Sequence, residues 1–243
     1  MSDLNSSPEQ VADTPVEGGD LALRARGLRK SFASPAGPLE VLKGIDLDVP
    51  RGMLLAITGA SGAGKSTLLH LLGALDRADT GTLQIGGVSV DALGERERCR
   101  LRCERLGFVF QFHHLLPEFT AEENVMMPLL VAGREMEPAR ERARALLEAV
   151  GLTARREHMP SELSGGEAQR VAVARALSAE PDLVLADEPS GNLDGATAAG
   201  LHDLLSFVVR ERHQTVVIVT HNDRLAAKAD RVLKLEGGRL LPA

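Results

Sequence analysis

The sequence predicts an α/β fold with a phosphate-binding loop at one end of a parallel sheet. Three short apolar runs, 53–58, 183–186 and 216–220, have the length and composition of strands buried on both faces. The first run leads into the glycine-rich segment 59–66, GASGAGKS, and then into a helical pattern over 67–75. Strand, glycine-rich loop and helix in this order favour a phosphate-binding loop over an ordinary glycine-rich turn.

The glycine-rich segment has the residue types that nucleotide phosphates require. Its three glycines let the backbone come close to phosphate, because no Cβ blocks the approach, and the backbone N–H groups then form an anion nest. Lys65 is predicted to reach the β- and γ-phosphates, and the Ser66 hydroxyl to bind Mg²⁺. The helix dipole after Thr67 points at the same phosphates. The residues predicted to bind nucleotide here are Gly59, Ala60, Ser61, Gly62, Ala63, Gly64, Lys65, Ser66 and Thr67.

Polar residues also follow the other two apolar runs. Asp187 and Glu188 end the second run, and His221 ends the third. Open α/β sheets bind ligands at the carboxyl ends of their strands, so these side chains are predicted to meet at the loop. Asp187 is predicted to hold Mg²⁺ through water, and Glu188 to polarise the water that attacks the γ-phosphate. His221 is interpreted as a γ-phosphate sensor, with a solvated loop histidine as the alternative.

A second glycine-containing helix start lies about a hundred residues after the loop. Ser164 and Glu167 form a capping box that opens a helix predicted over 165–179. With Gly165 and Gly166 it exposes free N–H groups and positive partial charge, which suit a γ-phosphate. An ordinary capped helix is the alternative. No phosphate of its own chain is in easy reach, so the motif implies a second copy facing the first.

Taken in order, these motifs resemble the nucleotide-binding subunit of an ATP-binding cassette (ABC) transporter. The resemblance covers residues 22–240 and implies a P-loop NTPase (RecA-like) core with an antiparallel β-lobe and an inserted helical lobe. It also implies ATP and Mg²⁺ as cofactors. The segments that carry it are GASGAGKS, Gln111 after Phe108-Val109-Phe110, LSGGE, LVLADEP, the loop 190–194 and His221.

The resemblance implies further roles for single residues. Gln111 would touch Mg²⁺ and the lytic water, and Asp194 would close the loop that crosses to the partner subunit. Phe32 falls where the family stacks an aromatic, most often Tyr, on adenine; the chain has no Tyr or Trp, so Phe32 stacks without offering a hydroxyl. The predicted catalytic residues are Glu188, His221 and Gln111, and the predicted metal-binding residues are Ser66, Gln111 and Asp187.

The rest of the chain is predicted to form a tail and two lobes. Residues 1–20 are polar, acidic and rich in Ser, Pro and Gly, which predicts a disordered tail before a single nucleotide-binding domain over 21–243. Alternating patterns at 21–26 and 42–49, with short strands within 81–90, predict the antiparallel lobe. No motif recurs, so a homodimer would complete two composite sites.

The helical lobe is expected over about 112–170, hinged at Gln111. A capping box at Thr120 and Glu123 starts one helix, and Pro138 is expected to open another near 139–150. The lobe is expected to carry Ser164 to the partner's nucleotide.

The stretch QFHHLLPEFT at 111–120, followed by EENVMMPLL at 122–130, resembles the lipoprotein-releasing, LolD-type subfamily of ABC subunits. That resemblance implies a peripheral subunit on the cytoplasmic face of the bacterial inner membrane, paired with two permease subunits that pass lipoproteins to a periplasmic carrier. A macrolide-exporter-like or cell-division-type complex is the alternative. His113 and His114 are interpreted as a permease-docking surface rather than a metal site, because further ligands are not nearby. The apolar residues around them fit docking or lobe core equally: Phe112, Leu115, Leu116, Phe119, Met126 and Met127.

Composition and motif spacing argue against several other classes of function. The net charge of −6, with acidic and basic residues interspersed, gives no support for nucleic-acid binding. A chromosome or repair ATPase would carry long coiled coils between the two glycine motifs. No apolar stretch approaches the ~20 residues of a membrane span, and the N-terminus lacks the features of a secretory signal. Cys99 and Cys103 are too few for a zinc site and are expected to be buried or half-buried thiols in the cytosol.

Overall fold

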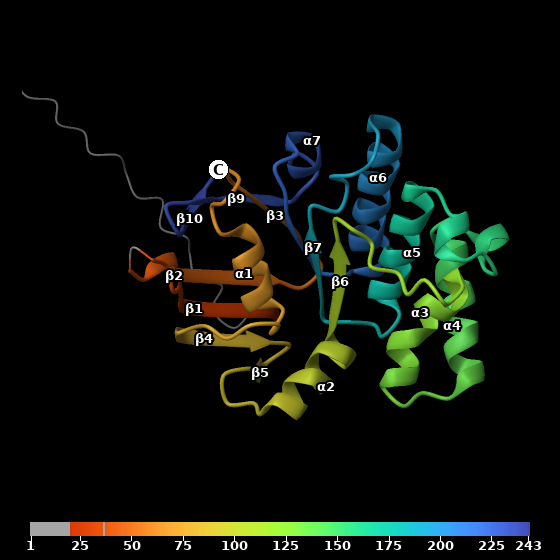
Figure 1. Ribbon diagram of the computed structural model, residues 1–243, viewed down its shortest axis with the longest axis horizontal. Helices are drawn as coiled ribbons and strands as arrows, with labels where there is room; N and C mark the ends of the chain where they lie inside the picture. Colours follow the sequence, from red (N-terminus) through yellow and green to blue (C-terminus); the bar gives the residue numbers. More distant parts are fainter. Residues whose placement is uncertain (1–19, 36) are drawn as a thin grey trace, which may run out of the picture.

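The computed structural model describes residues 20–35 and 37–243, which form two sheets with helices packed against them (Figure 1). The predicted disordered tail falls outside these residues, except for Asp20. The antiparallel strands lie at one side of the molecule. Helices α3 (Ala121–Val131) and α4 (Met136–Ala149) lie at the other side.

A six-stranded sheet in the order β10-β9-β3-β8-β7-β6 carries the nucleotide motifs. Its central strands β3, β8 and β7 are parallel, with Ala56 beside Ile218 and Ala186 beside the same Ile218. They are almost entirely buried, as their continuous apolar runs predict. The strands are β3 (Leu54–Thr58), β6 (Leu106–Phe110), β7 (Leu183–Asp187), β8 (Val216–Val219), β9 (Arg231–Glu236) and β10 (Arg239–Pro242).

A second sheet is antiparallel, in the order β2-β1-β4-β5. The two strands predicted at 21–26 and 42–49 are confirmed, and both are longer, because β1 pairs with β2 along its full length. Apolar side chains of this sheet, of helix α1 and of one face of the six-stranded sheet form one continuous core. The elements are β1 (Leu21–Phe32), β2 (Leu39–Pro50), α1 (Lys65–Leu72), β4 (Thr80–Ile85) and β5 (Val88–Ser89).

A second core joins the helices to the opposite face of the six-stranded sheet. The capping boxes predicted at Thr120 and Ser164 are both confirmed, since each hydroxyl accepts a bond from the backbone N–H three residues on. The remaining helices are α2 (Glu95–Arg105), η1 (Thr153–Arg155), η2 (Pro160–Glu162), α5 (Gly165–Leu177), α6 (Gly195–Arg212) and α7 (Asp223–Ala226).

Two local predictions need correction. Helix α4 begins at Met136 rather than at Pro138, because the two residues before a proline can already occupy the first turn. The thiol of Cys103 is half-buried against the Pro128 carbonyl, as expected, whereas Cys99 is exposed. Both cysteines lie on the arginine-rich helix α2, and Cys99 is on the side of this helix that faces solvent.

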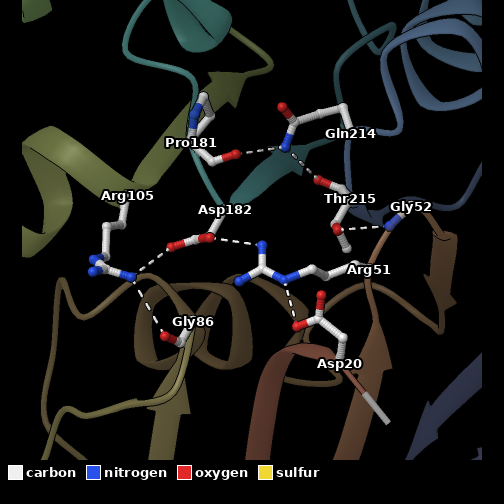
Figure 2. A network of polar contacts seen from close by, with 9 residues as sticks. All are labelled: Asp20, Arg51, Gly52, Gly86, Arg105, Pro181, Asp182, Gln214 and Thr215. Atoms are coloured by element: carbon white, nitrogen blue, oxygen red, sulfur yellow. Dashed lines mark hydrogen bonds and ion pairs between the residues drawn. The ribbon is translucent and has the colours of Figure 1, made fainter.

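The amino ends of the parallel strands are fastened by a network of charged residues (Figure 2). Asp182, just before β7, accepts from Arg51 Nη1 at 2.7 Å and from Arg105 Nη1 at 3.0 Å. Arg51 Nε also donates to Asp20 at the start of β1. Gly86 packs so closely beneath Asp182 that a Cβ there would lie 2.3 Å from a carboxylate oxygen. The network thus ties the antiparallel sheet to the six-stranded sheet at the edge opposite the glycine-rich loop.

Candidate nucleotide site

The glycine-rich loop and the polar ends of β7 and β8 meet at one edge of the sheet, as predicted. They line a pocket of about 700 Å³ that also reaches Phe32 and Gln111. The residues lining it are Phe32, Val41, Gly59, Ala60, Ser61, Gly62, Gly64, Lys65, Ser66, Thr67, Gln111, Asp187, Glu188 and His221. All of the residues predicted to act on this chain's own nucleotide therefore lie together, except Ala63, whose N–H closes the loop onto Ala60.

Two loop glycines are required by their surroundings. Gly59 has a φ of +154°, and a Cβ there would lie 2.6 Å from the carbonyl oxygen of Leu235 in β9. Gly64 has a φ of +98°, and a Cβ would lie 2.7 Å from Val41 Cγ1. The loop is thus pressed between both sheets, so its position relative to the β-lobe is fixed by backbone contacts that any side chain would disrupt.

The Lys65 side chain forms hydrogen bonds to the backbone of the loop that carries it. Its ammonium Nζ donates to the carbonyl oxygens of Gly59 at 2.8 Å and Ala60 at 3.1 Å. Both partners are neutral, and a phosphate oxygen is a much stronger acceptor for an ammonium group. Lys65 is therefore already extended into the pocket in a position from which it can exchange carbonyls for phosphate.

Asp187 and Ser66 bring oxygen atoms together beneath the loop. Burial raises the pKa of the Asp187 carboxyl, and the neighbouring charge of Glu188 raises it further, while a hydrogen bond from the Ser66 hydroxyl lowers it. A carboxylate with this environment gains from a nearby cation. Hydroxyl and carboxylate oxygens are the ligands that Mg²⁺ prefers, so the donor set fits that ion.

Glu188 adopts a left-handed backbone conformation, with a φ of 44°. Such a conformation costs a non-glycine residue about 1–3 kcal/mol and persists only where the surroundings fix it. Its carboxylate accepts from Thr220 Oγ1 at 2.9 Å and lies 2.7 Å from His221 Nδ1. The strain turns the carboxylate back over the end of β8, so that the predicted base and the predicted sensor are in direct contact.

Gln111 lies at the pocket rim but is engaged with the loop after β7. Its Nε2 donates to Asn192 Oδ1 at 3.0 Å, and Asn192 Nδ2 donates back to the Gln111 carbonyl at 3.2 Å. Gly191 packs against the same side chain, where a Cβ would lie 2.9 Å from Nε2. The sequence predicted Gln111 for the metal and did not anticipate this amide pair. An asparagine in a loop carries no periodic signal that would reveal such a partner.

Phe32 ends β1 at the pocket opening with 43% of its surface exposed. The ammonium of Lys30 lies 5.5 Å from its ring centroid, within cation–π range. Lys30 is in turn paired with Asp76 at 2.8 Å. The Lys30 ammonium therefore helps to hold the Phe32 ring in place, and the ring keeps an exposed surface on which a planar ligand can stack.

The LSGGE helix start lies outside this pocket. None of Ser164, Gly165, Gly166 and Glu167 is among the residues that line it. Glu167 Oε2 accepts from the Ser164 backbone N–H at 2.9 Å and from its hydroxyl at 2.8 Å. These bonds and the Arg155 guanidinium lower the pKa of Glu167 to about 2. The motif is thus a capped helix start that lies apart from the pocket of its own loop.

A contact between α6 and the same helix explains one glycine of the motif. A Cβ on Gly166 would lie 2.2 Å from Thr197 Cγ2, in the first turn of α6. Asp194, expected only to close the loop towards a partner, caps α6 through bonds from Ala196 N and Thr197 N at 3.0 Å. The sequence Asp-x-x-Thr could have revealed this cap.

The segment after Gln111 is anchored by helix α5. Arg175 donates to the carbonyl oxygens of His114 at 2.6 Å and His113 at 2.7 Å, and Gln169 donates to that of Phe110 at 2.9 Å. Helix α5 starts with the LSGGE motif, so the two predicted functional segments are held by one rigid element. The buried Gln169 and the half-buried Arg175 were missed, because polar residues on a helix look like surface residues in sequence.

The apolar residues of this segment divide between core and surface. Leu115 and Met126 are buried, and Met127 is half-buried. Phe112 is 66% exposed, and Leu116 and Phe119 are also exposed. The core interpretation is thus confirmed for Leu115 and Met126, while docking by the exposed residues stays a prediction.

Comparison with known proteins identifies the class. Residues 42–191 match the ABC transporter family. The chain is 35% identical to the ATP-binding cassette MJ0796 in a dimeric, post-hydrolysis state bound to ADP and Pi, with a TM-score of 0.82 over 90% of this chain and 96% of that one. The fold and the pocket are those of an ABC transporter ATPase cassette.

Closer relatives narrow the family. The lipoprotein-releasing system ATP-binding protein LolD of Bordetella pertussis is 54% identical over 91% of this chain and 96% of its own length. LolD of Legionella pneumophila (strain Lens) is 52% identical over 91% and 97%. The chain belongs to the LolD family of ABC ATP-binding proteins. Within residues 20–35 and 37–243, no helix is long and apolar enough to cross a membrane.

Proposed function

We propose that this ABC ATPase powers the release of lipoproteins from the bacterial inner membrane to a periplasmic carrier. In this proposal it is bound at the cytoplasmic face to two permease subunits, and two copies of the chain act together. The support is its high identity to LolD proteins along nearly their whole length, which favours this function over the macrolide-exporter and cell-division alternatives. The single structural observation that carries the mechanism is the pocket shared by the loop, Asp187, Glu188 and His221.

The nucleotide is held by the loop and the braced phenyl ring. Backbone N–H groups of 59–67 and the Lys65 ammonium bind the β- and γ-phosphates, while adenine stacks on Phe32. Ser66 and Asp187 would hold Mg²⁺, with Gln111 in contact with it, and the ion would supply neutralisation of charge on the phosphates. For Gln111 to take that role, its side chain must exchange the Asn192 amide for the metal site.

Hydrolysis depends on Glu188. Its carboxylate polarises the attacking water, which is general-base work. His221, bonded to that carboxylate, orients it and contacts the γ-phosphate. The strained backbone at Glu188 keeps the carboxylate on this side of the sheet, which is the side on which the loop presents the γ-phosphate.

The second copy completes each site. Ser164, Gly165, Gly166 and Glu167 do not line their own chain's pocket. The capping box uses the N–H groups of Ser164 and Glu167, so the groups offered to a phosphate are the first-turn N–H groups of Gly165 and Gly166. Two copies placed head to tail would each cap the γ-phosphate of the other. Closure would then move α5, and with it the segment that Arg175 fastens to α5.

The proposed docking surface is the segment 112–119, in which His114 and Glu118 are exposed. A charge left unpaired in a buried interface costs about 2–5 kcal/mol. His114→Asp and Glu118→Lys are therefore expected to retain ATP affinity and the free subunit's hydrolysis, yet to fail to co-purify with the permeases or to release lipoprotein. Glu211→Lys, an exposed charge change on α6, serves as the control. Normal assembly and transport by both variants would refute the docking surface.

A further inference from the structure

The segment that carries Glu188 is anchored from below by a buried histidine that the nucleotide chemistry does not use. His202, in the middle of α6, places its Nε2 2.9 Å from Ser190 Oγ. Both residues are almost fully buried, with 3% and 6% of their surfaces exposed. Each partner satisfies the hydrogen-bonding capacity of the other, so removing either side chain would leave a buried polar group without its hydrogen bond.

Ser190 links two hydrogen-bonded segments of the loop that follows β7. The N–H of Gly191 donates to the Glu188 carbonyl at 2.9 Å, so residues 188–191 form a β-turn with Pro189 at its second position and Ser190 at its third. The N–H of Leu193 then donates to the Ser190 carbonyl at 3.2 Å. Ser190 is therefore the joint between the turn that begins at the base and the loop that ends in Asp194.

Glu188 needs such an anchor because its left-handed conformation is unfavourable by itself. On the β8 side it is held by Thr220 and His221. On the other side the turn is held through Ser190, and His202 supplies the side-chain bond there. Burial lowers the pKa of His202, and Lys228 lowers it further while Asp203 opposes this, so the ring is neutral and can exchange one hydrogen bond with a hydroxyl.

We propose that His202 is a positioning residue for ATP hydrolysis, acting through Ser190 to fix the turn that aims Glu188 and the loop that faces the partner copy. The inference deepens the proposed function and rests on it. His202 touches neither nucleotide nor metal, so its loss should leave ATP binding intact. Its effect belongs to the chemical step, because the aim of the base changes while the phosphate-binding loop does not.

The test compares steady-state Mg-ATPase activity of the full chain and four single variants. His202→Leu and Ser190→Ala are expected to lower kcat by about 10- to 100-fold, the range for a small misplacement of a catalytic group. KM and ATP affinity should stay close to wild type, since ground-state binding is untouched. His202→Gln, which keeps a polar amide near the position of Nε2, is expected to recover most of kcat. Leu205→Val, a buried change one turn further along α6, is the control for lost packing and should keep kcat.

A double-mutant cycle sharpens the result. If the two residues act through their shared bond, His202→Leu combined with Ser190→Ala should be no slower than the slower single variant. Wild-type kcat in His202→Leu, or additive losses in the double variant, would overturn the inference. If His202→Leu does not fold, Ser190→Ala alone decides, and wild-type kcat in it would overturn the inference as well. If the wild-type chain neither hydrolysed ATP nor bound permeases, the proposed function itself would be refuted.

Discussion

The two edges of the six-stranded sheet use similar residues in opposite ways. At the amino edge, Asp182 is shared by the guanidinium groups of Arg51 and Arg105, and each charge meets an opposite charge (Figure 2). At the carboxyl edge, the hydrogen bonds of the Lys65 ammonium within residues 20–35 and 37–243 go to backbone carbonyls, and burial raises the pKa of Asp187. The paired edge stabilises the fold, whereas the other edge keeps charges that are predicted to bind phosphate and metal.

The hydrogen bonds around the backbone also differ between the two edges. At the carboxyl edge, Glu188 is strained and needs bonds from Thr220, His221 and the Ser190 turn to stay in place. At the amino edge, Thr215 and Gln214 bond to Gly52 and to the Pro181 carbonyl at 3.0 and 2.9 Å. Left-handed backbone alone does not separate the edges, because Glu180 and His213 near the amino edge also have positive φ angles, 54° and 50°. What separates them is the pairing of charged side chains, which is weaker at the edge where the catalytic residues are predicted. Variants at the two edges should therefore separate activity from stability.

The largest effect is expected for Glu188→Gln at the carboxyl edge. The amide cannot take a proton from water, so hydrolysis should fall by about 10²–10⁴-fold, while ATP still binds. Because ATP persists, the dimer should accumulate. The check is turnover measured beside gel filtration in Mg-ATP. Only monomer in gel filtration would count against the composite site.

Ser164→Arg tests whether the LSGGE motif acts on the other copy. A bulky cation at the helix start would crowd the γ-phosphate and oppose the helix dipole. Since Ser164 lies outside its own pocket, ATP binding by the monomer should be unchanged while dimerisation and hydrolysis fail. Fluorescent-nucleotide titration of the monomer is the measurement. Lost monomer binding would show that the motif acts within its own chain.

At the amino edge the expected change is in stability alone. Asp182→Asn removes the charge that both arginines share, and hydrogen bonds to charged groups contribute about 1.5–3 kcal/mol. The melting temperature should fall, with kcat per folded molecule unchanged. Glu104→Gln, which breaks an exposed pair with Arg100, should shift stability by less than about 0.5 kcal/mol. A reduced kcat in Asp182→Asn would mean that the two edges are coupled.

The features that the sequence could predict are those with a local pattern. The buried parallel strands are continuous apolar runs, and the loop, the strand-end acids and both capping boxes have fixed spacings, so all were found. The partners of those residues were not. The bonds from Asn192 to Gln111, from Arg175 to His113 and His114, and from His202 to Ser190 join segments up to 81 residues apart. Such pairings follow from the packing of helices on the sheet, which no local pattern encodes.

The smallest effect concerns Glu167 and pH. Its pKa is about 2 in the folded chain and 4.5 when unperturbed, so the folded state binds its proton less readily. The stability that the carboxylate contributes is therefore complete above about pH 4.5 and is lost as pH falls towards 2. Glu167→Gln keeps a capping amide but loses the charge paired with Arg155, which is worth less than about 1 kcal/mol at a surface.

The measurement is the difference in unfolding free energy between wild type and Glu167→Gln, followed from pH 6 to pH 3. That difference should be largest at pH 6 and shrink as pH falls, because the unfolded chain takes up the proton near pH 4.5 whereas the folded carboxylate does so only near pH 2. Glu162→Gln is the matched control, because Glu162 makes the corresponding bond to its cap residue, accepting from Met159 N at 2.7 Å. Its difference from wild type should vary less with pH. A difference for Glu167→Gln that stays constant down to pH 3 would show that the bonds of Ser164 and Arg155 to Glu167 do not depend on its charge. The start of α5 would then be held by neutral capping alone.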